Sequence, residues 1–153
     1  MKFEIVQTPL LSLSAEAVVN RANIGLQYAS GLCGEIFDAA GKIPLQRALC
    51  AIGTCSVGHA VVTSGFSLPS RFIIHAVPPC WCGGKHGEDK ILAQCYRNVL
   101  ALAERLKVHS LALPLLSRDR FGYPEELDLQ IAKQEIAAYP FAEDMQIYLS
   151  LAG

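Results

Sequence analysis

Two asparagines and two glycines form the first group of residues that could bind a ligand. Asn20 and Asn23 lie three residues apart after an apolar stretch. Their amides can donate and accept hydrogen bonds together, which suits sugar hydroxyls or the fixing of a loop. Gly31 and Gly34 flank the start of a predicted helix, where free backbone N–H groups and the helix dipole favour an anion such as a phosphate. An alternative stays open, in which Asn23 caps a turn and the glycines only relieve crowding.

Cys33 lies between these glycines, after Leu32, in the sequence SGLCGEIF. Its thiol could be a nucleophile, a metal ligand, or only a small group that fits. The N-terminus of the predicted helix is the one local feature that would activate the thiol as a nucleophile. The sequence therefore favours a small residue at a helix start that binds phosphate.

A second polar segment follows the apolar stretch HSLALPLL and ends in an aromatic residue. Its residues are Ser117, Arg118, Asp119, Arg120 and Phe121. The chain then turns through Gly122 and Pro124 into a predicted helix. An aromatic ring beside a helix N-terminus can stack on a ribose while the N–H groups hold phosphate. That Phe121 instead fills the core is an equally open alternative.

Cys80, Cys82 and His86 lie within seven residues and could hold a metal ion. Their C-x-C-x3-H spacing is not a common zinc arrangement, and the sequence offers no evident fourth ligand. We therefore expect neither a metal nor a cofactor. His75 lies inside the apolar stretch FIIHAV, where we expect a core histidine that is satisfied by hydrogen bonds.

Strands and helices must alternate to position these segments. Periodicity predicts strands at 2–6, 15–19, 58–65, 71–77, 109–116 and 145–151, and helices at 32–40, 45–51, 88–107 and 125–138. Several of the strands are apolar throughout, which is typical of a sheet buried on both faces. The pattern predicts one domain over 1–153, a three-layer α/β/α sandwich with a mixed, largely parallel central sheet. In such sheets ligands bind beyond the carboxyl ends of strands, where both polar segments lie.

Composition limits the possible partners. The 153 residues are 52% hydrophobic and 18% charged, with a net charge of −1 and no block of lysine or arginine, so we expect no duplex nucleic acid partner. Apolar stretches are interrupted well short of the ~18 residues that a membrane span requires, and no signal peptide is evident. Six cysteines, several of them in apolar patterns, are expected to be reduced, which predicts a cytoplasmic protein.

Taken together, the chain resembles the macrodomain family. The resemblance covers essentially the whole chain and rests on the stretches AVVNRAN, GLCGEIFDAAG, GHAVVTSGFSLPSRFIIHAV, CYRNVLALA and SLALPLLSRDRFGYP. It implies an α/β/α sandwich that binds ADP-ribose, either free or attached to proteins. It further implies that hydrolysis of ADP-ribosyl esters, or deacetylation of O-acetyl-ADP-ribose, is a reaction open to some members.

The resemblance also assigns roles to individual residues. Asn23 corresponds to the active-site asparagine that contacts the distal ribose, and Phe121 to the aromatic residue that packs near it. The first phosphate-binding loop corresponds to Gly31, Leu32, Cys33 and Gly34, and the second to Ser117, Arg118, Asp119, Arg120 and Phe121. Asn20 is included among the ligand-binding residues.

Four departures from the family pattern bear on activity. Pro9 stands where many relatives have an acid that holds the adenine amino group, and Cys33 stands where many active hydrolases have an aspartate. Tyr28, with the two residues after it, replaces a run of glycines and is expected to narrow the pocket. Asp119 replaces a glycine, and a carboxylate beside a diphosphate is repulsive unless an arginine pairs with it. Two functions therefore stay open: an ester hydrolase and a non-catalytic reader of ADP-ribose or a related nucleotide.

Overall fold

Six strands form one sheet in the computed structural model, which describes residues 1–118 and 121–152. The strands are β1 (Lys2–Val6), β2 (Ala17–Arg21), β3 (Ala60–Ser64), β4 (Phe72–Ala76), β5 (Ser110–Pro114) and β6 (Gln146–Ser150). Their order across the sheet is β1-β6-β5-β2-β4-β3. Every neighbouring pair is parallel except β3 and β4, which are antiparallel. The prediction of a mixed, largely parallel sheet is confirmed.

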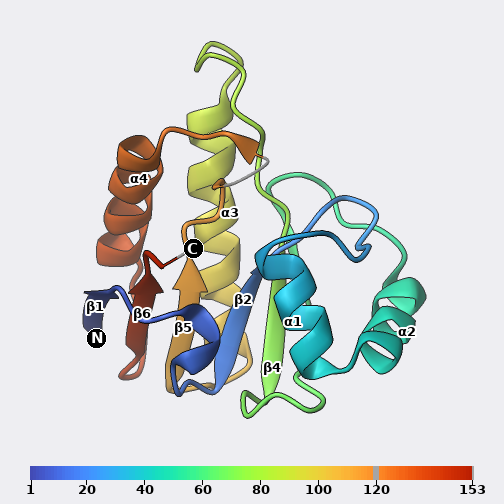
Figure 1. The fold of residues 1–153 in the computed structure, drawn as a ribbon. Helices are drawn as coiled ribbons and strands as arrows, with labels where there is room; N and C mark the ends of the chain where they lie inside the picture. Colours follow the sequence, from blue (N-terminus) through green and yellow to red (C-terminus); the bar gives the residue numbers. More distant parts are fainter. Residues whose placement is uncertain (119–120, 153) are drawn as a thin grey trace.

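Helices cover both faces of this sheet (Figure 1). They are α1 (Leu32–Ala40), α2 (Lys42–Ile52), α3 (Glu88–Arg105) and α4 (Glu125–Ala138), with a short 3-10 helix, η1 (Leu10–Ser12). Residues of α3 and α4 share one core cluster with one face of the sheet, whereas α1, α2 and η1 share another cluster with the opposite face. The three-layer α/β/α sandwich is therefore confirmed.

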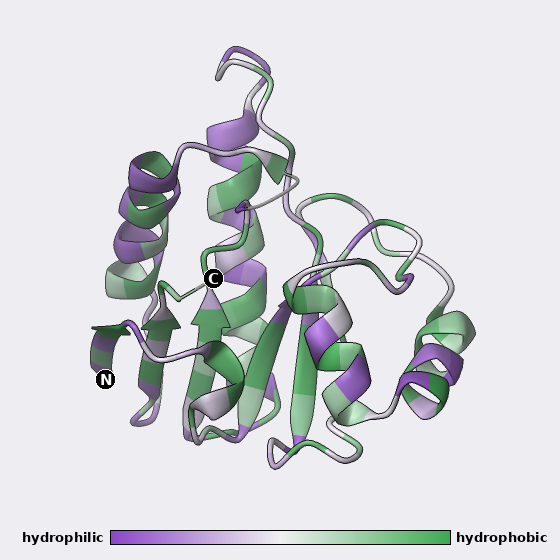
Figure 2. Cartoon of the chain, in the orientation of Figure 1, coloured by the Kyte–Doolittle hydropathy of each residue, from purple (hydrophilic) through white to green (hydrophobic). Residues whose placement is uncertain are grey.

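The central strands alternate between these two clusters residue by residue. Val19 of β2 packs with the α3 and α4 cluster, and its neighbour Val18 packs with the α1 and α2 cluster. In the same way, Ile74 and Ile73 of β4 point to opposite faces. Because both faces are covered, these strands are largely apolar, as the green of most of their length in Figure 2 shows, with polar residues only toward their carboxyl ends. None of the helices in the described residues is long and apolar enough to cross a membrane.

The boundary of β2 differs from the sequence prediction in a way that matters for the site. The strand begins at Ala17 and continues through Asn20 and Arg21, two residues beyond the predicted end. These polar residues remain in the strand because their side chains are bonded inside the protein. The Asn20 amide donates to His75 Nδ1 over 3.1 Å, and Arg21 Nε donates to the Leu115 carbonyl over 2.7 Å.

The helix predicted at 45–51 also begins earlier, at Lys42. Pro44 lies in its first turn, where the N–H group that proline lacks has no intrahelical partner in any case. Gly41 ends α1 with φ 109° and donates its N–H to the Phe37 carbonyl. The helix predicted at 32–40 is therefore confirmed in its bounds, and Gly41 separates α1 from α2.

Candidate functional site

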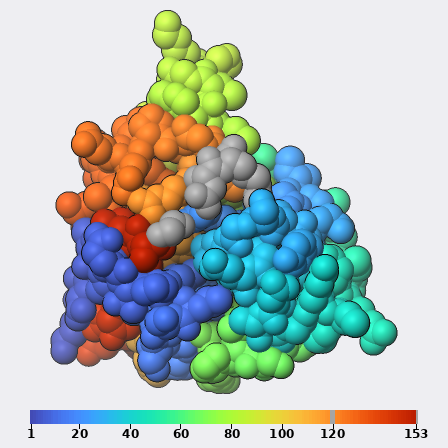
Figure 3. Space-filling model, in the orientation of Figure 1, coloured from blue at the N-terminus to red at the C-terminus, as the bar shows by residue number. Residues whose placement is uncertain are grey.

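The candidate site lies beyond the carboxyl ends of β2, β4 and β5. Figure 3 views the face where the N-terminal segment (blue), α1 (cyan) and the segment after β5 (orange) converge. Two cavities lie here. The Asn23 cavity, of about 370 Å³, is lined by residues that include Asn23, Ile24, Val57, Pro78, Cys80 and Phe121. The Glu35 cavity, of about 400 Å³, is lined by residues that include Pro9, Leu11, Gly31, Leu32, Glu35 and Ala152.

Asn23 shapes the loop after β2 while it lines its cavity. Its Oδ1 accepts the Gln27 N–H over 2.9 Å, and its Nδ2 donates to the Gln27 carbonyl over 2.9 Å. Both ends of the amide therefore hold the loop, as one of the two sequence interpretations anticipated. Each end keeps further capacity, because an amide oxygen has two lone pairs and the NH2 group has two hydrogens. Asn23 can thus fix its loop and still contact a sugar hydroxyl.

Asn20 occupies a different environment from the one expected of a ligand-binding residue. Its side chain is 1% exposed and lies opposite His75 in the β2–β4 register. His75 in turn bonds Thr63 Oγ1 through Nε2 over 2.9 Å. Since Thr63 donates its own hydrogen to the Ser64 carbonyl, His75 must donate from Nε2 and accept the Asn20 amide at Nδ1. Asn20 therefore supports the strand beneath the site and does not face a ligand.

His75 is the core histidine that the sequence predicted. It is fully buried, and desolvation by burial lowers its pKa to about 3. A neutral imidazole is the form that can both accept from Asn20 and donate to Thr63.

Cys33 is packed at the base of the first loop. The side chain is 2% exposed, and its thiol contacts the Asn20 amide and the Gln27 carbonyl, each over 3.8 Å. The same Gln27 carbonyl accepts from Asn23, so the cysteine joins the strand to the loop. This environment fits the interpretation of Cys33 as a small packed residue.

The first turn of α1 begins at the wall of the Glu35 cavity, which Gly31 and Leu32 line. Gly31 precedes the helix with φ 75°, a conformation that glycine adopts without strain. The carbonyl of Gly31 accepts the N–H of Glu35 over 3.1 Å, so the N–H groups of residues 32–34 precede the first intrahelical bond. A Cβ on Gly34 would lie 2.7 Å from the Ala29 carbonyl oxygen, which explains why this position is glycine. The geometry is that of an anion-binding helix start.

Tyr28 does not narrow either cavity in the way that the sequence suggested. Its ring packs edge-on against Phe37 with centroids 5.5 Å apart, and Lys42 Nζ lies 4.2 Å from the ring centre. Its hydroxyl donates to Asp38 over 3.3 Å. The side chain is therefore held against the outside of α1 and lines neither cavity.

The segment after β5 is held by a buried pair that sequence reasoning missed. Tyr96 of α3 donates to Asp128 of α4 over 2.5 Å and accepts the Leu116 N–H over 3.0 Å. Asp128 also accepts the Ser117 N–H over 2.9 Å. Burial raises the pKa of Asp128, while the hydrogen bonds from Tyr96 and Ser117 oppose that shift. Ser117 itself is fully buried and donates its hydroxyl to the Pro79 carbonyl over 2.7 Å. It positions the segment through these bonds.

Arg118 and Phe121 complete the described part of this segment. Arg118 forms an ion pair with Glu125 and donates to the Leu151 carbonyl over 2.6 Å, so it ties the segment to α4 and to the C-terminal residues. Phe121 is 8% exposed and lines the Asn23 cavity. Its backbone carbonyl accepts the Trp81 N–H over 2.8 Å. The predicted ligand contacts Asp119 and Arg120 lie outside the described residues.

The loop with Cys80, Cys82 and His86 is organised by a carboxylate. Glu88, at the start of α3, accepts three backbone N–H groups, from Cys82 (2.9 Å), Gly84 (2.8 Å) and His86 (2.6 Å). All six cysteines of the chain are free thiols. Within 1–118 and 121–152, no group of three or more His, Cys, Asp or Glu side chains is arranged to hold a metal ion.

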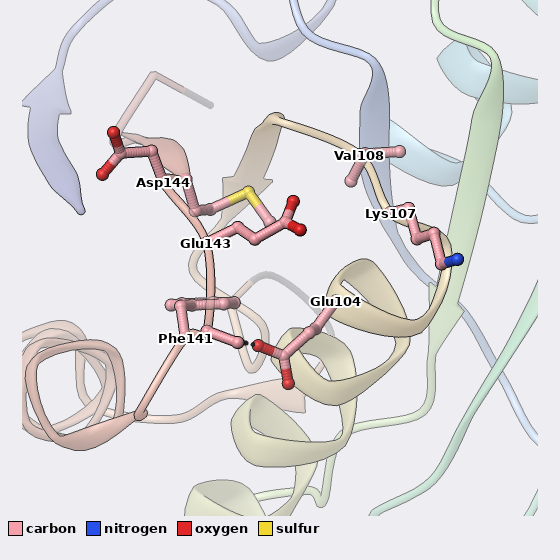
Figure 4. Close-up of a pocket in the computed structure, with 8 residues that line it drawn as sticks. Glu104, Lys107, Val108, Phe141, Glu143 and Asp144 are labelled. Atoms are coloured by element: carbon pink, nitrogen blue, oxygen red, sulfur yellow. Dashed lines mark hydrogen bonds between the residues drawn. The ribbon is translucent and has the colours of Figure 1, made fainter.

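A third cavity, of about 210 Å³, lies at the opposite end of the sheet, where α3 ends and β6 begins (Figure 4). Glu104 lines it and is already bonded, since its carboxylate accepts the Ala142 N–H over 2.9 Å and the Tyr139 hydroxyl over 3.2 Å. These bonds hold the α4–β6 connection against α3. The carboxylate of Glu104 in this cavity is therefore explained by its role in holding that connection.

An α/β/α domain with an anion-binding helix start beside a cavity at the carboxyl edge of its sheet belongs to the class of nucleotide-binding domains. A sequence model of the Macro domain family matches residues 19–132. Since this match covers most of the chain, the protein belongs to the macrodomain family, as the sequence resemblance implied.

Relatives and solved structures agree with this assignment. A macro domain-containing protein of Chlorobaculum tepidum is 42% identical over 127 residues, which cover 83% of this chain and 73% of the relative. An O-acetyl-ADP-ribose deacetylase of Salmonella newport is 35% identical over 154 residues, which cover 96% and 85%. The Oceanobacillus iheyensis macrodomain with ADP superposes with a TM-score of 0.91 at 33% identity and covers 99% of this chain and 83% of that one.

Proposed function

We propose that this protein binds ADP-ribose, free or attached to protein, and hydrolyses esters of ADP-ribose such as O-acetyl-ADP-ribose. The observation that carries the proposal is that the Glu35 cavity, the N–H groups at the start of α1 and the Asn23 cavity all lie at the carboxyl edge of the sheet. These three parts suit a base, a diphosphate and a distal ribose respectively. A deacetylase relative that covers 96% of this chain supports the choice of reaction.

Each part of the site would contribute one interaction. The N–H groups of residues 32–34 and the positive end of the helix dipole would hold the diphosphate without a cation. Asn23 would bind a hydroxyl of the distal ribose through the free capacity of its amide, and Phe121 would form the apolar wall beneath that ribose.

The residues described around the Asn23 cavity include neither a carboxylate nor a histidine. A water molecule that attacks the ester would therefore need another group to accept its proton, and a phosphate oxygen of the substrate is the acceptor that the binding mode supplies. The protein would then act by positioning substrate and water, and by stabilising negative charge with backbone N–H groups.

The environment of Cys33 favours a second candidate function, a reader that binds ADP-ribose without turnover. Cys33, where many active relatives have an aspartate, is buried and bonded within the protein. Binding and turnover must therefore be measured separately.

The experiment combines calorimetric titration of ADP-ribose with an assay for hydrolysis of O-acetyl-ADP-ribose. Wild type, Asn23→Ala and the control Gln130→Ala, which truncates an exposed amide on α4, are compared. We expect Asn23→Ala to lower both affinity and turnover while Gln130→Ala changes neither. Tight binding by wild type without release of acetate would establish the reader function. Absence of ADP-ribose binding would refute both functions.

The proposal also includes the compartment. Six free thiols, three of them exposed, suit a reducing environment such as the cytoplasm.

A further inference from the structure

We propose that Glu35 recognises the amino group of the nucleobase and so makes the site selective for adenine. The inference rests on the proposed function, because it concerns the base of the same nucleotide. It starts from the Glu35 cavity, where one carboxylate lies among aliphatic walls.

The Glu35 cavity is built from three chain segments, two of which hydrogen bonds hold together. Pro9 and Leu11 come from the turn into η1, Gly31 and Glu35 from the start of α1, and Ala152 from the segment after β6. The Ser150 hydroxyl donates to the Thr8 carbonyl over 2.6 Å, and the Leu151 N–H donates to the Val6 carbonyl over 2.9 Å. These bonds fix two walls of the cavity, which opens beside the N–H groups expected to hold the diphosphate.

Its walls suit the face of a flat ring. Pro9, Leu11, Leu32 and Ala152 present aliphatic surface, against which a purine gains free energy by leaving water. Pro9 has neither a backbone N–H nor a polar side chain, so it cannot recognise a base edge. Selectivity in this cavity must come from another residue.

Among the described residues that line the cavity, Glu35 carries the charged side chain. Its carboxylate carries no hydrogen bond or ion pair within residues 1–118 and 121–152, and it is exposed. An ionised carboxylate only accepts hydrogen bonds, and the 6-amino group of adenine is a donor. The two groups are complementary, and the bond would be strengthened by the charge of the carboxylate.

Another explanation of Glu35 is a solvated acid that stabilises α1 through the helix dipole, since it lies in the first turn. The chain supplies a matched control for that effect. Glu126 is an exposed acid in the first turn of α4 and lines none of the three cavities described above. A dipole effect would act equally at both positions, whereas recognition of the base concerns Glu35 alone.

The test is a calorimetric cycle of two ligands and four proteins. The ligands are ADP-ribose and its analogue with unsubstituted purine, which lacks the 6-amino group. The proteins are wild type, Glu35→Ala, Glu35→Gln and Glu126→Ala. We expect wild type and Glu126→Ala to prefer ADP-ribose about tenfold, the loss typical of one charge-assisted hydrogen bond. Glu35→Ala should lose the preference, and Glu35→Gln, which keeps a neutral acceptor, should retain part of it.

The ratio of the two affinities decides the question, because a change of charge near the diphosphate would alter both affinities together. Equal ratios in wild type and Glu35→Ala, with ADP-ribose still bound, would overturn the assignment of Glu35 and leave the proposed function standing. Failure of wild type to bind either ligand would overturn the proposed function and the role of Glu35 with it.

Discussion

The buried His75 should make the stability of the protein depend on pH. In the folded state burial lowers the pKa of His75 to about 3, from an ordinary value of 6.5. Between these two values the unfolded chain binds a proton that the folded chain does not. The free energy of unfolding therefore falls as the pH is lowered through 6.5, and it continues to fall until the folded pKa is reached.

The size of the effect follows from the same two values. Full titration of one such histidine changes the unfolding free energy by about 1.4 kcal/mol per pH unit. Between pH 7.5 and pH 5 the loss due to His75 amounts to about 2 kcal/mol, because protonation of the unfolded chain begins near 6.5. This is a large part of the stability of a typical single domain.

Urea denaturation at a series of pH values, followed by circular dichroism, measures this dependence. His75→Gln should lower stability at pH 7.5, since Asn20 and Thr63 lose their partner. Its unfolding free energy should also fall by about 2 kcal/mol less than that of wild type on acidification to pH 5. Gln130→Ala, which truncates an exposed amide and changes no titratable group, should keep the wild-type slope. Equal slopes for wild type and His75→Gln would refute the assignment of a neutral, buried His75.

Three further substitutions test the parts of the site. Gly34→Ala should destabilise the first loop by about 1–3 kcal/mol and weaken ADP-ribose binding, since its Cβ would lie 2.7 Å from the Ala29 oxygen; unchanged thermal melting and affinity would contradict this. Tyr96→Phe should cost about 2 kcal/mol in urea denaturation, because Asp128 and a backbone N–H lose a buried partner; no loss would contradict the buried pair. Cys33→Ala should cost about 1 kcal/mol and leave ADP-ribose affinity unchanged in calorimetry; complete loss of binding would contradict a packing role.

The positions of Asn23 and Phe121 could be predicted from the sequence because a general rule applies to them. Both follow strands of a largely parallel sheet, and ligands bind beyond the carboxyl ends of such strands. The structure brings the two residues together in one cavity. Apolar runs and helical periodicity fixed the order of the elements, since both signals are local.

The environment of Asn20 could not be predicted in this way. The residue lies opposite His75 because β2 pairs with β4 in one register, and that pairing joins positions 55 residues apart. From the sequence alone, a polar residue at the end of an apolar run looks like the start of a loop.

Tyr96, Asp128 and Glu35 were missed for a related reason. Tyr96 lies within the apolar stripe of a helix, and Asp128 and Glu35 are acids in first helical turns, where acids are common. Tyr96 and Asp128 are distinguished by contacts with distant segments, and Glu35 by a cavity that distant segments build around it, neither of which periodicity reveals. A tyrosine in a fully apolar helix stripe is the one signal that could have prompted a search for a buried partner.

The central claim is that the cleft beyond β2, β4 and β5 binds ADP-ribose. Calorimetric titration of the wild-type chain tests it most directly, with Asn23→Ala as the comparison. The account predicts saturable binding of one ADP-ribose per chain, weakened in Asn23→Ala. A wild-type protein that is folded by circular dichroism and shows no binding at ADP-ribose concentrations of about 1 mM would contradict it.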